Sequence, residues 1–152
     1  TAAHRWAHGF QNVNNTGGRS VLNFCKPSTG KTNNDFSLGQ QWWSAGTDAD
    51  LQTVEGGWQV YPWKYNNTDL PCLFIYTTWD NYSHGRYNLD PPTVFTQVSQ
   101  TWVLGGALPW AENFGNQLWM LWHLFSDQWN LFLVPPNGGE YEFIGYYPVS
   151  IF

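Results

Sequence analysis

One acidic side chain stands out in this sequence because it lies in the middle of an extended run rather than in a turn. The run 54–61 alternates between apolar and polar side chains, as expected for a strand with two different faces. Glu55 falls on the polar face together with Gln59 and Tyr61, and two glycines follow it directly. Glycine inside a strand often marks the close approach of a ligand or of another backbone. Glu55 is therefore the first candidate for acid–base chemistry.

A carboxyl group among aromatic side chains has a raised pKa, because apolar surroundings disfavour its charged form. Such a group can take a proton from a reacting molecule or donate one to it. The chain holds four glutamates, and the other three, Glu112, Glu140 and Glu142, lie in or beside turn-like segments. The alternative interpretation is that Glu55 is a solvated residue on the polar face of a strand. The residues alone leave both interpretations open.

Other patterns that could carry chemistry are weaker. The run 28–32 ends like a phosphate-binding loop, but Cys25 stands where the first glycine is needed and a turn follows instead of a helix. The four histidines lack the spacing of metal ligands, so we expect no metal and no other cofactor. The sequence also shows no strand-to-helix turn of the kind that presents a catalytic serine.

The chain holds 11 tryptophans, which support two roles. Those in strand-like runs fill the core or form the walls of a cleft: Trp42, Trp58, Trp102, Trp119, Trp122 and Trp129. Those near turns are Trp63, Trp79 and Trp110, where an exposed ring can stack on a sugar or a proline. The binding surface that we expect around Glu55 comprises Gln40, Trp42, Trp58, Gln59, Tyr61 and Trp79.

Strands are the elements that must position these residues. Helical periodicity is almost absent, whereas short strand-like runs recur between Gly, Pro, Asn and Asp residues. This pattern predicts an all-β fold, an antiparallel β-sandwich of about nine strands. No linker or internal repeat interrupts the pattern, so we expect one domain over residues 1–152. The predicted strands are 4–10, 19–25, 36–44, 51–61, 72–78, 95–105, 117–125, 129–134 and 141–147.

Composition narrows the class of protein and its compartment. Six basic residues and a net charge of −5 argue against a nucleic-acid partner, which needs a basic face. No apolar run reaches the roughly 18 residues of a membrane-spanning helix, so no membrane span is expected. Three glycosylation sequons, at Asn14, Asn66 and Asn81, and a start without Met or signal peptide favour a secreted, extracellular, processed glycoprotein. In that compartment Cys25 and Cys72 become candidates for a disulfide.

The segment around Glu55 resembles a known family. Residues 53–62, Thr-Val-Glu-Gly-Gly-Trp-Gln-Val-Tyr-Pro, are similar to the glutamate motif of the neprosin family. Segments 35–42, 66–68, 73–80, 87–89 and 143–148 also follow in the family's order, so the resemblance runs from about His4 to the end. It implies a β-sandwich and a proline-directed glutamic endopeptidase that works at acid pH, with Trp58 and Tyr61 shaping the cleft.

Two departures from the family pattern affect the expected mechanism. The family's cysteines around the segment that matches 87–89 are absent here. Its second catalytic glutamate lies in a strand beyond the segment that resembles 143–148, and this sequence ends at Phe152, so only Glu55 carries over. Three explanations stay open: a C-terminal piece that was removed or forms a separate chain, a stand-in such as Gln40, Gln59 or Glu142, or a site kept for binding alone.

Three functions follow from these observations. The first is a glutamic endopeptidase that uses Glu55 as general base or acid on Pro-containing peptides. The second is a non-catalytic, lectin-like module that binds glycans or Pro-rich peptides on exposed aromatic side chains. The third is a defence or toxin protein that acts on cell surfaces. If strands of the family are missing, an exposed sheet edge would invite a homodimer or a partner strand.

Overall fold

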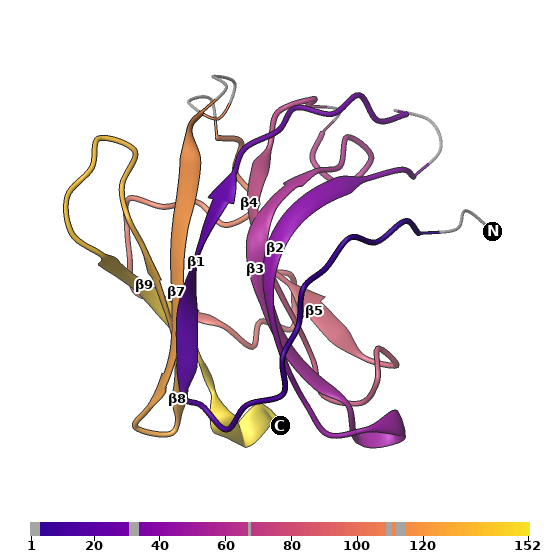
Figure 1. Cartoon of the computed structure of the whole chain (residues 1–152), viewed down its shortest axis with the longest axis vertical. Helices are drawn as coiled ribbons and strands as arrows, with labels where there is room; N and C mark the ends of the chain where they lie inside the picture. Colours follow the sequence, from indigo (N-terminus) through magenta and orange to yellow (C-terminus); the bar gives the residue numbers. More distant parts are fainter. Residues whose placement is uncertain (1–3, 31–33, 67, 109–110, 112–114) are drawn as a thin grey trace.

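The computed structural model describes residues 4–30, 34–66, 68–108, 111 and 115–152. It shows two antiparallel sheets packed face to face (Figure 1). One sheet has five strands in the order β1-β7-β8-β9-β6, and the other has four in the order β2-β3-β4-β5. The predicted antiparallel β-sandwich of nine strands is confirmed. Within the described ranges, no helix has the length and apolar character needed to cross a membrane.

The strand bounds follow the sequence pattern closely. The five-stranded sheet consists of β1 (Gly17–Asn23), β6 (Thr96–Gln97), β7 (Gln117–Phe125), β8 (Gln128–Leu133) and β9 (Glu142–Pro148). The four-stranded sheet consists of β2 (Ser37–Ala45), β3 (Gln52–Val60), β4 (Cys72–Thr78) and β5 (Gly85–Tyr87). Two short 3-10 turns, η1 (Asp48–Asp50) and η3 (Val149–Ile151), complete the described elements.

Two strand predictions were wrong for identifiable reasons. Residues 4–10 belong to no strand, and their side chains are exposed. Only β6 forms within the predicted strand 95–105, because the chain turns directly after it. The Gln97 side-chain amide donates to the carbonyls of Ser99 and Trp102, at 2.8 and 2.9 Å, and this holds the turn. The three-residue strand β5 was not predicted, because so short a run shows no alternation.

The core lies between the sheets and is built by strand alternation. On β7, Leu118, Met120 and Trp122 face the four-stranded sheet with 0% of their surface exposed. Burial of a side chain of this size contributes about 2–3 kcal/mol. Gly56 of β3 lies opposite, and a Cβ there would come within 3.0 Å of the Met120 sulfur and 3.1 Å of the Trp122 indole nitrogen. Glycine at this position therefore lets the two sheets approach.

The predicted disulfide is wrong, because both cysteines are free. Cys25 follows β1 of the five-stranded sheet and is exposed, whereas Cys72 begins β4 of the four-stranded sheet and is buried. Burial raises the pKa of the Cys72 thiol to about 11. The two residues thus lie beside different sheets, Cys25 after β1 and Cys72 at the start of β4, and in different environments.

The three sequon asparagines lie on the surface. Asn14, Asn66 and Asn81 are all exposed, and Asn66 and Asn81 both have a φ of 53°, typical of turn positions. Their exposure is compatible with glycosylation, which stays a prediction together with secretion.

Candidate functional site

The outer face of the four-stranded sheet carries Glu55 on one of its two central strands, β3. Register places Trp42 of β2 on one side of Glu55 and Tyr76 of β4 on the other. The sheet is curved, and the N-terminal segment runs past it (Figure 1). Trp6 of that segment packs against Trp42, with ring centroids 6.1 Å apart. Glu55 is 7% exposed as a result of these surroundings, although it points away from the core.

Three side chains hold the carboxyl group of Glu55. Thr53 Oγ1 donates a hydrogen bond to Glu55 Oε1 at 2.8 Å, and the Tyr82 hydroxyl donates to the same oxygen at 3.0 Å. The side chain of Gln40, from β2, adds a third hydrogen bond, and its Oε1 has no partner among the described residues. Thr53 is brought to Glu55 by the two-residue period of the strand. Gln40 and Tyr82 reach it only through the fold.

The loop between β4 and β5 holds Tyr82 over Glu55. Thr78 Oγ1 accepts the backbone N–H of Tyr82 at 3.0 Å and donates to the carbonyl of His84 at 2.5 Å. Asp80 accepts the backbone N–H of His84 at 2.7 Å, and its second oxygen lies 2.5 Å from His84 Nδ1. Tyr82 has a φ of 63°, a left-handed conformation that costs a non-glycine residue about 1–2 kcal/mol. The conformation that places this phenol over Glu55 therefore lowers the stability of the loop.

The electrostatics of the site centre on one carboxyl group. Burial raises the pKa of Glu55 above its ordinary value, because the carboxylate is poorly solvated on the covered face. Hydrogen bonds from Thr53, Tyr82 and Gln40 oppose this rise by stabilising the charged form. Burial, followed by the charge of Glu55, raises the pKa of Tyr76 to about 12 and also raises the pKa of Tyr82. Both phenols thus stay protonated in acid and at neutral pH.

Gln59 and Tyr61 continue the same face beyond Glu55. Gln59 is fully buried, and its Oε1 accepts a hydrogen bond from the Tyr65 hydroxyl at 3.1 Å. Four residues along a strand span roughly 13 Å, so Gln59 does not reach a water held by Glu55. The Tyr61 ring packs against Phe36, with centroids 5.2 Å apart. The two predicted binding residues therefore extend the surface rather than complete the acid–base site.

Trp58, predicted to shape the cleft, lies on the opposite side of the sheet. It is 4% exposed within the core, and its Nε1 donates to the carbonyl of Asn23 at 2.9 Å. Strand alternation is the reason, because residues 55 and 58 of one strand face opposite ways. Trp79 follows β4 directly, and its ring lies 5.9 Å from the Arg86 guanidinium. Arg86 pairs with Thr77, whose position along β4 faces the core side, so Trp79 also lies off the outer face.

Glu142, one of the suggested stand-ins for the second glutamate, lies on β9 of the other sheet. The hydroxyls of Ser99 and Thr101 both donate to its Oε1 at 2.7 Å, and Trp102 Nε1 donates to its Oε2 at 3.1 Å. These hydrogen bonds hold the pKa of Glu142 below its ordinary value. Glu142 thus fixes a loop and does not face Glu55.

Sequence reasoning missed the tyrosines of this face. Tyr76 stacks on Tyr82 with centroids 6.0 Å apart and contacts Tyr87 at 4.7 Å. Tyr76 could have been found, because alternation along 72–78 puts it on one face and β4 was predicted correctly. Tyr82 gave no such signal, since its place depends on the loop. Trp110 and Glu112 lie outside the described residues.

The described part of the chain contains no group of three or more His, Cys, Asp and Glu side chains close enough to hold a metal ion. The groups that contact the Glu55 carboxyl are instead hydroxyls and an amide. Such a set can orient the carboxyl group and a water beside it.

Comparison with known protein families matches residues 33–152 to the Neprosin family. The matched region covers well over half of the chain and includes both strands that flank Glu55 as well as β3 itself. The resemblance drawn from the glutamate motif is thereby confirmed. The chain belongs to the neprosin family, and at the family level it is a neprosin-like peptidase domain.

Proposed function

We propose that this chain is a secreted glutamic endopeptidase in which Glu55 activates a water molecule against Pro-containing peptides, with activity that rises through the acid range as Glu55 ionises. One observation carries the proposal: a buried carboxyl with a raised pKa lies on a strand face and is held on one oxygen by two hydroxyls. Both hydroxyls bind Oε1, so Oε2 is the oxygen that we assign to the water. Perturbed carboxyls of this kind concentrate at functional sites.

The reaction needs one proton carrier and one stabiliser of negative charge. Ionised Glu55 takes a proton from water while the water oxygen attacks the carbonyl carbon of the scissile bond. The carbonyl oxygen then bears the negative charge of the tetrahedral intermediate. Protonated Glu55 gives its proton to the departing amide nitrogen as the C–N bond breaks. The carboxyl thus returns to its ionised form at the end of each turnover.

Gln40 is the residue best placed to stabilise the intermediate. Its amide group can donate N–H bonds to a developing oxyanion, a role that side-chain amides fill in other hydrolases. It lies within hydrogen-bonding reach of Glu55, whereas Gln59 and Glu142 do not. A neutral amide shares no proton with Glu55. The ionisation of one carboxyl therefore determines how the activity rises with pH in the acid range.

Aromatic side chains support the choice of Pro-containing peptides. Trp42, the cross-strand neighbour of Glu55, is 42% exposed, and Tyr82 is 44% exposed. A flat ring with an exposed face can stack on a proline ring at little cost in conformational entropy. We assign these two rings to the substrate residues on either side of the scissile bond.

The position of β2 at the edge of its sheet offers another way to complete the site. β2 is the outermost strand of its sheet and carries Gln40 and Trp42. A strand added along this edge, from a second copy or from a separate C-terminal chain, would place its side chains beside Gln40. A second carboxyl supplied in this way would make activity depend on protein concentration or on the added chain.

The test is cleavage of Pro-containing peptides between about pH 2.5 and 7, where a perturbed glutamate titrates. Glu55→Gln keeps the size of the side chain but cannot carry the proton, so cleavage should be lost. Glu140→Gln is the matched control, because Glu140 is exposed on a turn of the other sheet and its variant should cleave like the wild type. A folded wild type that cleaves none of these peptides, or an active Glu55→Gln variant, would overturn the proposal.

A further inference from the structure

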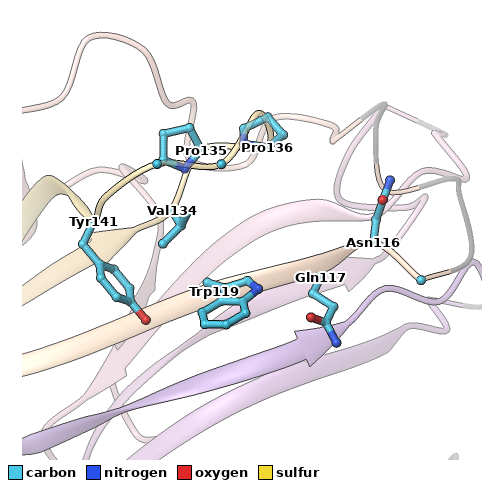
Figure 2. Close-up of a pocket in the computed structure, with 10 residues that line it drawn as sticks. Asn116, Gln117, Trp119, Val134, Pro135, Pro136 and Tyr141 are labelled. Atoms are coloured by element: carbon cyan, nitrogen blue, oxygen red, sulfur yellow. The ribbon is translucent and has the colours of Figure 1, made fainter.

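A depression lies on the outer face of the five-stranded sheet, in the layer opposite to Glu55. Its volume is about 520 Å³, which falls in the range of small-molecule sites. Strand β7 supplies Gln117 and Trp119, and the segment between β8 and β9 supplies Pro135, Pro136 and Tyr141 (Figure 2). The other described residues that line it are Gly115, Asn116, Val134, Gly138 and Gly139.

The fold presents Trp119 to this depression. Its neighbours Leu118 and Met120 are fully buried in the core, so alternation turns the Trp119 ring outward, where it is 39% exposed. The backbone N–H of Val134 donates to the carbonyl of Trp119 at 3.2 Å, which ties the start of the loop to β7. The indole is thus an exposed ring on a rigid strand, not a side chain on a free loop.

The loop between β8 and β9 forms the opposite wall. The backbone N–H of Gly138 donates to the carbonyl of Pro135 at 2.9 Å and closes a turn. Gly138 has a φ of 80°, which a glycine adopts without strain. Figure 2 shows the Tyr141 side chain projecting toward Trp119 from the end of this wall. Two aromatic rings and two proline rings therefore surround one space.

The chemistry of the lining matches a neutral sugar. Among the described residues that line the depression none is charged, so an anionic or cationic ligand finds no counter-charge there. A sugar ring presents C–H groups to aromatic faces and hydroxyls to amide groups. Gln117 Nε2 donates to Asn23 Oδ1 at 2.8 Å, which orders the amide as an acceptor for a sugar hydroxyl. Pyranose rings whose substituents are all equatorial, as in β-1,4-linked glucose, offer the flattest face to such a ring.

We propose that this depression binds a segment of a neutral, β-linked glucan, with one sugar ring stacked on Trp119 and its hydroxyls bound by Gln117 and Asn116. The site is separate from Glu55, since it lies on the other sheet of the sandwich. It would hold the domain on a glycan while the face around Glu55 stays open to a peptide. Binding therefore does not require the acid–base site.

The test is calorimetric titration of the whole chain with cellotetraose. We expect saturable binding, and at least a roughly tenfold weaker affinity for Trp119→Ala, because that variant loses the stacking face. Trp119→Phe keeps a smaller ring and should recover part of the affinity. Trp63→Ala is the control, because Trp63 is 65% exposed but lies outside this depression, and it should bind like the wild type. The Glu55→Gln variant should also bind normally, at about pH 4.5 and at pH 7 alike, because none of the described residues that line the depression carries a carboxyl group.

Three results would overturn this inference. The first is an absence of saturable binding by a folded wild type. The second is an unchanged affinity in a Trp119→Ala variant whose near-ultraviolet circular dichroism shows a native fold. The third is saturation by a proline decamer with no response to cellotetraose, which would make the depression a peptide site.

Discussion

Replacing Glu55 by glutamine should stabilise the fold at neutral pH and leave its stability nearly unchanged in strong acid. Burial raises the pKa of folded Glu55 above the ordinary value, so the folded state holds this proton more tightly than the unfolded chain does. The stability that the protonated group contributes is complete below the pKa of the unfolded chain, about 4.3, and is lost as the pH rises through the folded pKa. Glutamine is neutral throughout, so it avoids this loss.

The magnitude follows from the surroundings of the carboxyl. Each unit of difference between folded and unfolded pKa is worth about 1.4 kcal/mol. Hydrogen bonds from Thr53, Tyr82 and Gln40 offset part of the effect of burial on this pKa, and glutamine keeps an oxygen that can accept hydrogen bonds from the two hydroxyls. A net gain on the order of 1 kcal/mol at pH 7 raises the Tm of a domain of this size by about 2–4 °C.

Thermal unfolding followed by circular dichroism at about pH 3, 5 and 7 measures this difference across the window that the raised pKa defines. The Tm of Glu55→Gln should exceed that of the wild type by an amount that grows as the pH rises. Glu140→Gln supplies the matched control, because Glu140 is exposed, and its Tm should follow the wild type at each pH. The opposite trend is a Tm of the wild type that rises relative to the Tm of Glu55→Gln as the pH rises. It would show that the three hydrogen bonds lower the pKa of Glu55 by more than burial raises it, and it would refute the reasoning about this site.

Three further predictions follow from the same geometry. Tyr82→Phe removes a donor to the carboxylate, so the pKa of Glu55 should rise further and the acid limb of kcat/KM should move to higher pH; an unmoved limb in a folded variant would separate Tyr82 from the chemistry. Gln40→Ala should lower kcat by roughly 100-fold with little change in KM, because it removes an oxyanion donor, and a loss confined to KM would make Gln40 a binding residue instead. In a thiol titration of the native protein, exposed Cys25 should react at once, whereas buried Cys72 should react only after unfolding; two fast thiols would contradict the burial of Cys72.

The fold was predictable where alternation is long and flanked by turns. The bounds of β4 and β7 were predicted to the residue, since each strand has a regular pattern and clear turn residues at its ends. The strand prediction for residues 4–10 was wrong because strand-like composition says nothing about whether a pairing partner exists. Strand β5 was not predicted for the opposite reason: its pairing with β4 makes it a strand, although the pattern of its own three residues does not indicate one.

The residues of the site also divide into those that the sequence could predict and those that it could not. Glu55 could be placed on a polar face, because alternation within β3 fixes it. Gln40 was a candidate through its chemistry, and only the pairing of β2 with β3 brings it to Glu55. Trp58 was misplaced when the family resemblance was preferred over alternation, which puts residue 58 on the face opposite to Glu55. Tyr82 could not be found, because its phenol reaches Glu55 through a left-handed residue and a four-residue hydrogen-bond network in a loop. A functional residue that lies in a loop is not revealed by the alternation of side chains along the strands.

The pH profile separates the two ways in which this site could work. Two carboxyls that share one proton titrate in two linked steps, so their activity rises and falls again within the acid range. A carboxyl that faces only hydroxyls and an amide titrates once, and its activity rises through a single raised pKa without that second limb. With Gln40 as the partner of Glu55, we therefore expect one ionisation in the acid limb. A bell-shaped profile that appears only at high protein concentration would instead show that a second carboxyl arrives along β2 from another chain.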